Sequence, residues 1–536
     1  MQKINQIKKL TQLLLAIVVF IMPWNPPQLY PSAKLPFQKG MTYTTWPAGK
    51  FGTPDADAAL SNITGIGANW IALIVTQYQT DLDTTSIYPT ADTESDDELI
   101  HAINQAHKLG LKVMFKPQLD PLVNTADHWR GLIGQSFTIP QWALWFTSYR
   151  NFITHYATIA QNTGVEQFCI GVELNATTSH VTEWRSTIAA IRAIYHGPLT
   201  YAAIGIKAIK DIQWEDALDY TGVDFYNGLA LGKTDPTVQD IKDAWTPYMQ
   251  DLASVYATWN KPILITELGY MSQDGAVQQP WNWQNTDGVL DMQEQANAYE
   301  AAFESLFYQP WLYGIYWWDI GTDPFEGGPC DQRYTPHNKP AEDIVRAWYN
   351  GRPATTRLDP QTAGASTFEA LPAGNQTLGI YSDGLAPGWN NQSSNSEVNL
   401  LSASPVFSGT YAISVIAQTQ GTFSIQHAAF DATPYTWLEF YIQRPWVGEQ
   451  VRVFVNDASD TELRSLPLCR YMTGPLNPLT WNRVRIPLSD LNAVGRTLQR
   501  ISFKNVTNQP QSFWVDEIRL IGAGWRAYIP LINHFR

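Results

Sequence analysis

The chain has 536 residues, of which 35 are Lys or Arg and 49 are Asp or Glu, which gives a net charge of −14. This acidic balance argues against a protein that binds nucleic acid or anionic membranes, because both need a basic surface. The apolar content of 44% excludes a disordered chain, and the length is sufficient for two or more domains.

The N-terminal segment is typical of a secretory signal peptide. Three lysines within the first nine residues precede an apolar run from Leu13 to Met22, and a proline-rich leader extends to residue 36. The apolar run is too short for an ordinary transmembrane helix, so we expect residues 1–36 to be a signal peptide and leader, cleaved near Ala33. The protein would then be secreted. An uncleaved anchor that keeps it at the cell surface is the alternative.

Between residues 37 and 350, strand-like apolar runs alternate with helix-like amphipathic stretches. The predicted strands are Met41–Trp46, Trp70–Thr76, Lys112–Gln118, Gln167–Leu174, Leu199–Ala203, Tyr220–Tyr226, Ile263–Gly269 and Tyr313–Asp319. The predicted helices are Asp97–Leu109, Gln141–Gln161, Val181–Tyr195, Val238–Trp259, Glu294–Phe307 and Ala341–Tyr349. This alternation predicts the α/β class and a parallel sheet, and eight strands can close a (β/α)8 TIM barrel. An open, doubly wound sheet is the alternative, but no glycine-rich phosphate loop follows the first strand.

The composition changes after the predicted barrel. Residues 351–362 form a predicted linker, residues 363–523 are rich in short alternating strands, and residues 524–536 are a tail without a predicted role. The strands predicted in this part are Tyr411–Ile416, Trp437–Ile442, Val451–Val455, Arg483–Ile486, Ser502–Asn505 and Ser512–Leu520. Their regular spacing predicts an antiparallel β-sandwich of the jelly-roll type.

Two glutamates stand where predicted barrel strands meet their following loops. Glu173 closes an apolar run that begins at Phe168, and Glu267 closes the run that begins at Ile263. The carboxyl ends of barrel strands form the catalytic face, so we expect both carboxylates at the same mouth. Two carboxylates there can serve as proton donor and nucleophile for cleaving a bond between sugars. The alternative is that both are structural acids, held by ion pairs or by helix N-termini.

Aromatic residues are unusually frequent, with 22 Trp and 25 Tyr. Their rings offer flat apolar faces with polar edges, which suit the faces of neutral sugars. We expect Trp46 and Trp318, at strand ends, and Trp281 and Trp283, in the loop after the seventh strand, to bind substrate. Core packing and anchoring of the loop are the alternatives for these residues.

Three polar residues near the predicted mouth are further candidates for substrate binding. Lys116 ends the third strand, Asp120 follows that strand, and Asn175 follows Glu173 closely. Lys116 could equally be a partner for Asp120 or for a catalytic glutamate. The Cys and His residues show no spacing that is typical of a metal site, so no metal or cofactor is expected.

Several short motifs, taken in their order, resemble glycoside hydrolase family 113, whose better-known members are β-mannanases of clan A. The motifs are Lys116-Pro117-Gln118-Leu119-Asp120, His128-Trp129-Arg130-Gly131, Gly171-Val172-Glu173-Leu174, Glu183-Trp184-Arg185, Thr200-Tyr201-Ala202-Ala203, Gly222-Val223-Asp224-Phe225-Tyr226, Thr266-Glu267-Leu268-Gly269-Tyr270, Tyr316-Trp317-Trp318-Asp319 and the run from Tyr334 to Glu342. The resemblance covers about residues 40–349.

The resemblance implies a retaining glycoside hydrolase that cleaves a β-1,4-linked neutral glycan, above all β-mannan. We expect it to act as a secreted monomer. The resemblance also implies that Glu173 is the acid/base, that Glu267 is the nucleophile and that Tyr226 orients the nucleophile by a hydrogen bond. A packing role for Tyr226 at the barrel mouth is the alternative. The C-terminal part resembles, more loosely, galactose-binding-like carbohydrate-binding modules, which implies polysaccharide binding.

The chain departs from the clan pattern at places that bear on substrate choice. Val172 stands where the clan usually has Asn, Ile204-Gly205 follows the fifth strand in place of Asn-Trp, and Asn227-Gly228 replaces a bulkier turn. Two other functions therefore stay open. One is a non-catalytic glycan-binding surface protein on a barrel scaffold, against which the two glutamates argue. The other is a β-glycosidase of the same clan that acts on another β-glycan.

Overall fold

The computed structural model describes residues 36–46, 48–285, 288–351, 376–446, 450–473 and 479–522. The predicted signal peptide with its cleavage site, nearly all of the predicted linker and the C-terminal tail lie outside the described residues. Within the described residues, no helix combines the length and the apolar character that crossing a membrane requires.

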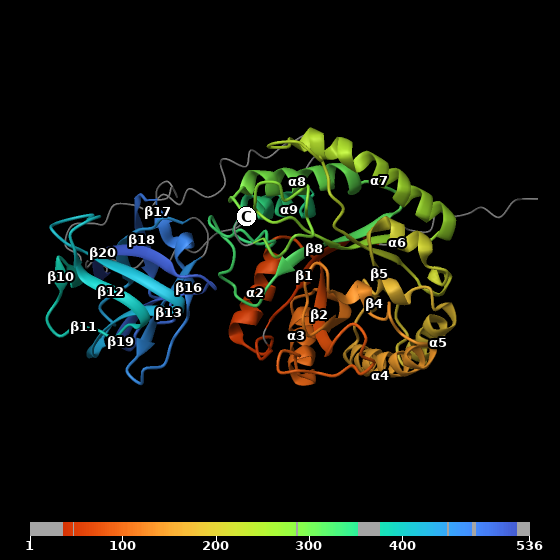
Figure 1. Ribbon diagram of the computed structural model, residues 1–536, viewed down its shortest axis with the longest axis horizontal. Coiled ribbons are helices and arrows are strands. Elements are labelled where there is room, and N and C mark those ends of the chain that lie inside the picture. Colours follow the sequence, from red (N-terminus) through yellow and green to blue (C-terminus); the bar gives the residue numbers. More distant parts are fainter. Residues whose placement is uncertain are drawn as a thin grey trace, which may run out of the picture. The chain divides into compact units, whose positions relative to one another are not determined.

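Eight parallel strands close into a barrel, because β1 pairs with both β2 and β8 (Figure 1). The strands are β1 (Gln38–Tyr43), β2 (Trp70–Gln79), β3 (Lys112–Pro121), β4 (Gln167–Val172), β5 (Leu199–Ile204), β6 (Thr221–Phe225), β7 (Ile263–Leu268) and β8 (Leu312–Ile320). The predicted TIM barrel is confirmed, and each observed strand starts within three residues of its predicted start. A barrel strand is covered on both faces, so β4, β6 and β7 are buried at every position.

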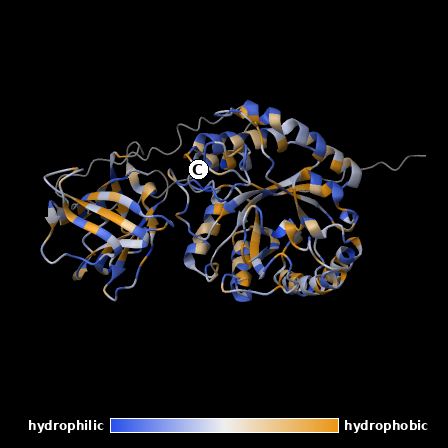
Figure 2. Cartoon of the chain, viewed as in Figure 1, coloured by the Kyte–Doolittle hydropathy of each residue, from blue (hydrophilic) through white to orange (hydrophobic). Residues whose placement is uncertain are grey.

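Helices follow the strands and surround the barrel (Figure 1). They are α2 (Pro54–Gly65), α3 (Asp96–Lys108), α4 (Ile139–Thr163), α5 (Val181–Arg192), α6 (Gly205–Asp211), α7 (Val238–Trp259), α8 (Met292–Leu306) and α9 (Pro340–Tyr349). Hydrophobic and hydrophilic residues alternate along them, as the amphipathic patterns predicted (Figure 2). The sequence prediction missed α2, which Thr53 caps, and α6, which follows β5 without an intervening loop.

The barrel interior is closely packed near the N-terminal ends of its strands. Trp70, Ala72, Met114 and Tyr316 form a buried cluster there. A Cβ atom at Gly40 would lie 2.3 Å from the Tyr316 ring, so the ring occupies the space that a larger residue at position 40 would need. The carboxyl ends of the strands lie at the opposite end of the barrel, where side chains are available for function.

The C-terminal domain is an antiparallel β-structure with the strand order β16-β15-β19-β13-β20-β14-β18-β17. Its strands are β9 (Thr377–Ser382), β10 (Gly384–Leu385), β11 (Asn390–Asn391), β12 (Ser394–Ser402), β13 (Ala412–Asp431), β14 (Trp437–Gln443), β15 (Val451–Asp457), β16 (Leu466–Pro467), β17 (Met472–Thr473), β18 (Trp481–Pro487), β19 (Thr497–Asn505) and β20 (Gln511–Ile521). The first part of β13 pairs with β20 and the second part with β19, so one strand serves two layers.

The two layers of this domain enclose a hydrophobic core. Phe440 on β14 contacts Phe503 on β19 with ring centroids 5.0 Å apart, although these two strands are not neighbours in the sheet. This contact therefore crosses between the layers. All six predicted strands are present, while β9–β12, β16 and β17 were not predicted. β10, β11, β16 and β17 have two residues each, and β12 is rich in Ser and Asn.

Candidate active site

Glu173 leaves the end of β4 in a conformation that few residues adopt. Its φ of 54° lies in the left-handed region, which costs about 1 kcal/mol or more for a residue with a side chain. Neighbouring groups on β5 hold it: the Glu173 amide donates to the Ala202 carbonyl at 2.8 Å, and the Leu174 amide donates to the Tyr201 hydroxyl at 2.8 Å. These contacts fix the backbone of Glu173 at the carboxyl end of β4, at the barrel mouth.

Glu267 on β7 is almost fully buried, and donors contact both of its carboxylate oxygens. Oε1 accepts hydrogen bonds from Lys116 Nζ at 2.5 Å and, more weakly, from Gln118 Nε2 at 3.5 Å. Oε2 accepts a hydrogen bond from the Tyr226 hydroxyl at 3.0 Å. Donors from β3 and from the residue after β6 thus fix the carboxylate plane.

A third carboxylate lies beside the two predicted ones. One carboxylate oxygen each of Glu173, Asp224 and Glu267 lies within 4.8 Å of the others. Such a spacing would suit a divalent cation, but the Lys116 ammonium already binds both oxygens of Asp224, at 3.1 and 3.2 Å, as well as Glu267. A metal ion would have to displace this ammonium.

The proton affinities of these groups follow from burial and from their neighbours. Burial raises the pKa of Glu173 to about 8, against the opposing effect of the Arg130 guanidinium. Burial and the Glu267 carboxylate raise the pKa of Asp224, whereas Lys116 and the Thr266 hydroxyl lower it. Burial alone would lower the pKa of Lys116, but the two carboxylates that it contacts raise it above its usual value.

Two of the polar residues predicted to bind substrate are already engaged by the protein. Lys116 is fully buried, and its ammonium lies among Asp224, Glu267 and the Thr266 carbonyl. Both carboxylate oxygens of Asp120 accept hydrogen bonds from Arg130, at 2.8 and 2.9 Å. These contacts favour the reading of Lys116 as a partner of a catalytic glutamate. The Asn175 side-chain oxygen, in contrast, is buried without a hydrogen-bond partner among the described residues.

Aromatic side chains line the mouth next to the carboxylates. The rings of Trp46 and Trp318 have centroids 6.2 Å apart, and those of Tyr226 and Tyr334 are 6.3 Å apart. Trp318 and Tyr226 both pack against a small cluster that contains Tyr334 and Met271. Trp46 is 50% exposed, so part of its ring is free to contact a ligand.

Trp281 and Trp283 lie in the loop after β7 and are 52% and 51% exposed. Neither is in the core. Trp317, the neighbour of Trp318, points the other way and stacks on Tyr299 of α8 at 3.9 Å. The alternation of side chains along β8 therefore leaves Trp318 as the residue of this pair that belongs to the mouth.

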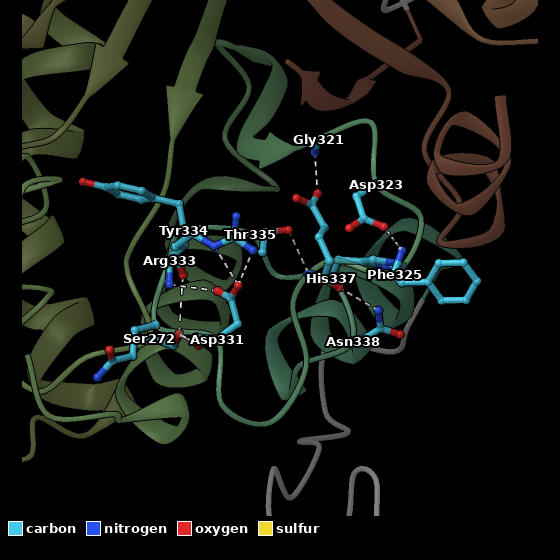
Figure 3. A network of polar contacts seen from close by, with 12 residues as sticks. Ser272, Gly321, Asp323, Phe325, Asp331, Arg333, Tyr334, Thr335, His337 and Asn338 are labelled. Atoms are coloured by element: carbon cyan, nitrogen blue, oxygen red, sulfur yellow. Dashed lines mark hydrogen bonds and ion pairs between the residues drawn. The ribbon is translucent and has the colours of Figure 1, made fainter. Parts of the chain in front are cut away.

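The loop after β8 is fixed by a network of polar contacts (Figure 3). Asp331 accepts hydrogen bonds from the Arg333 amide and Nε, both at 2.8 Å, and pairs with Lys339 Nζ at 2.8 Å. The Ser272 hydroxyl donates to the Asp331 carbonyl at 2.5 Å. Tyr334 extends from this network, so the buried ion pair fixes the backbone of a residue that lines the mouth.

Sequence reasoning did not select Asp224, Gln118, Arg130 or Tyr334 as site residues. Asp224 carried a signal, because an aspartate inside a strand that is buried at every position is costly unless it has a partner. Arg130 begins a short 3-10 helix after β3 and Tyr334 lies in the loop after β8, so their positions next to the site depend on how these segments return to the barrel.

Comparisons with known proteins agree with this geometry. Residues 41–339 match the model of Glycoside Hydrolase Family 113, and residues 380–523 match that of the Expansin-like protein C-terminal domain. The second match replaces the looser expectation of a galactose-binding-like module. None of the curated proteins compared with the chain matches it.

Solved structures of family 113 enzymes are similar to the barrel. A complex of a GH113 β-1,4-mannanase is 27% identical with a TM-score of 0.53, and the match covers 59% of this chain and 100% of that one. The β-mannanase AaManA from Alicyclobacillus acidocaldarius, in complex with ManMIm, is 30% identical with a TM-score of 0.52, covering 59% and 98%. Both similarities concern the part of the chain that holds the carboxylates.

Proposed function

Because this chain belongs to glycoside hydrolase family 113, we propose that it hydrolyses β-1,4-linked mannan with retention of anomeric configuration. The observation that carries this proposal is the separation of the carboxylates: oxygens of Glu173 and Glu267 lie within 4.8 Å of each other. Retaining enzymes need a separation of roughly 5 Å, whereas inverting enzymes leave room for a water molecule between the carboxylates.

Glu173 acts as the acid/base and Glu267 as the nucleophile. In the first step, Glu267 Oε2 forms a bond to the anomeric carbon while the bond to the leaving oxygen breaks and Glu173 gives its proton to that oxygen. In the second step, Glu173 takes a proton from water, which attacks the anomeric carbon and releases Glu267. The pKa of about 8 at Glu173 keeps this group protonated at neutral pH, as the first step requires.

The aromatic residues that line the barrel mouth favour a neutral sugar polymer as the substrate. Trp318 and Trp46 offer ring faces beside the carboxylates, and the exposed Trp281 and Trp283 extend the aromatic surface along the loop after β7. The net charge of −14 would repel an anionic polysaccharide. Mannan is favoured among neutral β-glycans because the similar solved structures are β-mannanases.

The C-terminal domain is proposed to bind polysaccharide. Phe407 is 42% exposed and stacks on Tyr441 of β14, with centroids 3.6 Å apart and an interplanar angle of 15°. Trp481 of β18 adjoins Phe407 at 5.9 Å. Tyr441 alternates with the core residues Phe440 and Ile442, so these aromatic rings lie on the outer face of the sheet.

We further propose that the protein is exported and acts as a monomer. The lysine-rich start and the apolar run from Leu13 to Met22 support export. A polymeric substrate is also found outside cells. All the side chains assigned to the reaction come from one chain, so a monomer is sufficient.

A panel of insoluble mannan, cellulose and xylan tests the proposal by release of reducing sugar, with the Glu267→Ala protein as the blank. We expect wild-type activity on mannan above all, and NMR of the first product should show the β-anomer. Preference for cellulose or xylan would indicate another β-glycanase of the same clan. Binding of glycan without hydrolysis of any substrate would indicate a non-catalytic glycan-binding protein.

A further inference from the structure

Lys116 and Asp224 form an ion pair that is completely enclosed in the barrel. Their side chains are 0% exposed, and Lys116 Nζ lies 3.1 Å from Asp224 Oδ1. They come from β3 and β6, which are not neighbours in the barrel, so the pair crosses its interior. Thr266 on β7 adds a hydrogen bond from its hydroxyl to Asp224 Oδ1 at 2.6 Å.

The same ammonium contacts the nucleophile. Lys116 Nζ lies 2.5 Å from Glu267 Oε1, and this oxygen is turned toward the closed interior, where Lys116 is inaccessible to solvent. Oε2 is bound only by Tyr226 among the described donors, and Tyr226 lies among the aromatic residues of the mouth. The two oxygens of Glu267 thus have different surroundings.

We propose that Lys116 and Asp224 are positioning residues for Glu267. Asp224 and Thr266 hold the Lys116 side chain in place, and the Lys116 ammonium fixes Oε1 by a hydrogen bond and offsets the charge of the carboxylate, so that Oε2 faces the anomeric carbon. This role rests on the proposed function, because it assigns Glu267 as the nucleophile.

The charge of the cluster supports this role. With Lys116 positive, Asp224 and Glu267 ionised and Glu173 protonated, the cluster carries one net negative charge before the reaction. When Glu267 forms the ester and Glu173 loses its proton, the net charge of the cluster is the same. Without Lys116 the enclosed site would carry two negative charges throughout, and protonation of Glu267 would relieve their repulsion.

Other titratable and charged groups also face this cluster, but none of them takes the place of Lys116 as the cation beside Glu267. They are Cys169 from β4, Glu173 directly after β4, Tyr201 from β5, Tyr226 after β6, Asp319 from β8, Arg130 from a short 3-10 helix after β3, and Tyr334 from the loop after β8. Arg130, the other cation in this set, has both oxygens of Asp120 as its hydrogen-bond partners.

The test compares kcat/KM as a function of pH for full-length wild type, Lys116→Met and Asp224→Asn, with an activated aryl β-mannoside. For Lys116→Met we expect a loss of about 100-fold and an acidic limb that moves to higher pH by about one unit, because the carboxylate has lost its cation. For Asp224→Asn we expect about a 10-fold lower kcat and an acidic limb that stays in place or moves to lower pH, because a negative charge has been removed.

An acidic limb that moves to higher pH in Lys116→Met but not in Asp224→Asn separates positioning from a loss of stability, which would lower activity equally at every pH. Arg485→Met is the matched control, since Arg485 is also buried and donates a hydrogen bond of 2.7 Å to the buried Glu439, but lies in the C-terminal domain. It should lower the melting temperature without moving the acidic limb. If Lys116→Met does not fold, an upward shift or full activity in Asp224→Asn overturns the proposal.

The activity of the wild-type protein in the same assay distinguishes a failure of the proposed function from a failure of the positioning role. An inactive wild-type protein on every glycoside of the panel contradicts the proposed function. An active wild-type protein together with an unmoved acidic limb in Lys116→Met contradicts the positioning role alone.

Discussion

The hydroxyl of Tyr226 donates a hydrogen bond of 3.0 Å to Oε2 of Glu267, the carboxylate oxygen that Lys116 does not contact. Tyr226 follows β6 and Glu267 lies near the end of β7, so this contact joins neighbouring strands at their carboxyl ends. The hydroxyl can orient the carboxylate before it attacks, and its effect should be measurable by itself.

We expect Tyr226→Phe to lower kcat/KM by about 10- to 100-fold, because a hydrogen bond to a charged group contributes about 1.5–3 kcal/mol. Steady-state kinetics on a soluble mannooligosaccharide measure this loss, which should fall mainly on kcat. Tyr299→Phe is the control, because the Tyr299 hydroxyl is buried without a hydrogen-bond partner among the described residues. Equal kinetics for Tyr226→Phe and wild type would leave Tyr226 as a packing residue.

The two glutamates should differ in their dependence on the leaving group. Glu267→Ala should abolish activity on all substrates, whereas Glu173→Ala should keep much more activity on activated aryl glycosides than on polymer. A good leaving group does not need a proton from Glu173, but every substrate needs the nucleophile. Azide should rescue Glu173→Ala with a product of retained configuration. An azide product of inverted configuration from this variant would mean that the roles are reversed.

The pH profile should show a basic limb near the pKa of about 8 of Glu173. Above this pH the group loses the proton that it must donate, so kcat/KM for mannooligosaccharides should fall as pH rises through about 8. With an aryl glycoside that has a good leaving group, Glu173→Ala should lose this basic limb. A limb that persists unchanged in the variant would assign it to another group.

The aromatic face of the C-terminal domain should affect only insoluble substrate. We expect Phe407→Ala and Trp481→Ala to lower binding to insoluble mannan several-fold, and to leave turnover of soluble oligosaccharides unchanged, because the module raises the local enzyme concentration without touching the reaction. Pull-down assays measure the binding. Val494→Ala, which alters a side chain that is 65% exposed elsewhere in the domain, is the control. Equal losses on both substrates would indicate a structural role instead.

The sequence alone determined the barrel and the positions of its two glutamates. Strands that are buried on both faces need continuous apolar runs, and these runs marked all eight strands within a few residues. A polar residue that ends such a run must lie at the strand terminus, so Glu173 and Glu267 could be placed at the mouth. Long amphipathic helices could be predicted equally well from the sequence, and the predicted bounds of α7 (Val238–Trp259) match the observed helix. Short elements such as α6 carry too few residues for a periodic pattern.

The tertiary structure alone decided which side chains meet. Lys116 could have bound Asp120, a glutamate or substrate, and only closure of the barrel places its ammonium between Asp224 and Glu267. The contact depends on the register of β3 against β6 and β7 across the interior, which the pattern along one strand does not specify. The stacking of Phe407 on Tyr441 likewise depends on how a loop returns to the sheet. Local periodicity records which face of a strand is buried, whereas partners across the fold are set by distances between elements that are far apart in the sequence.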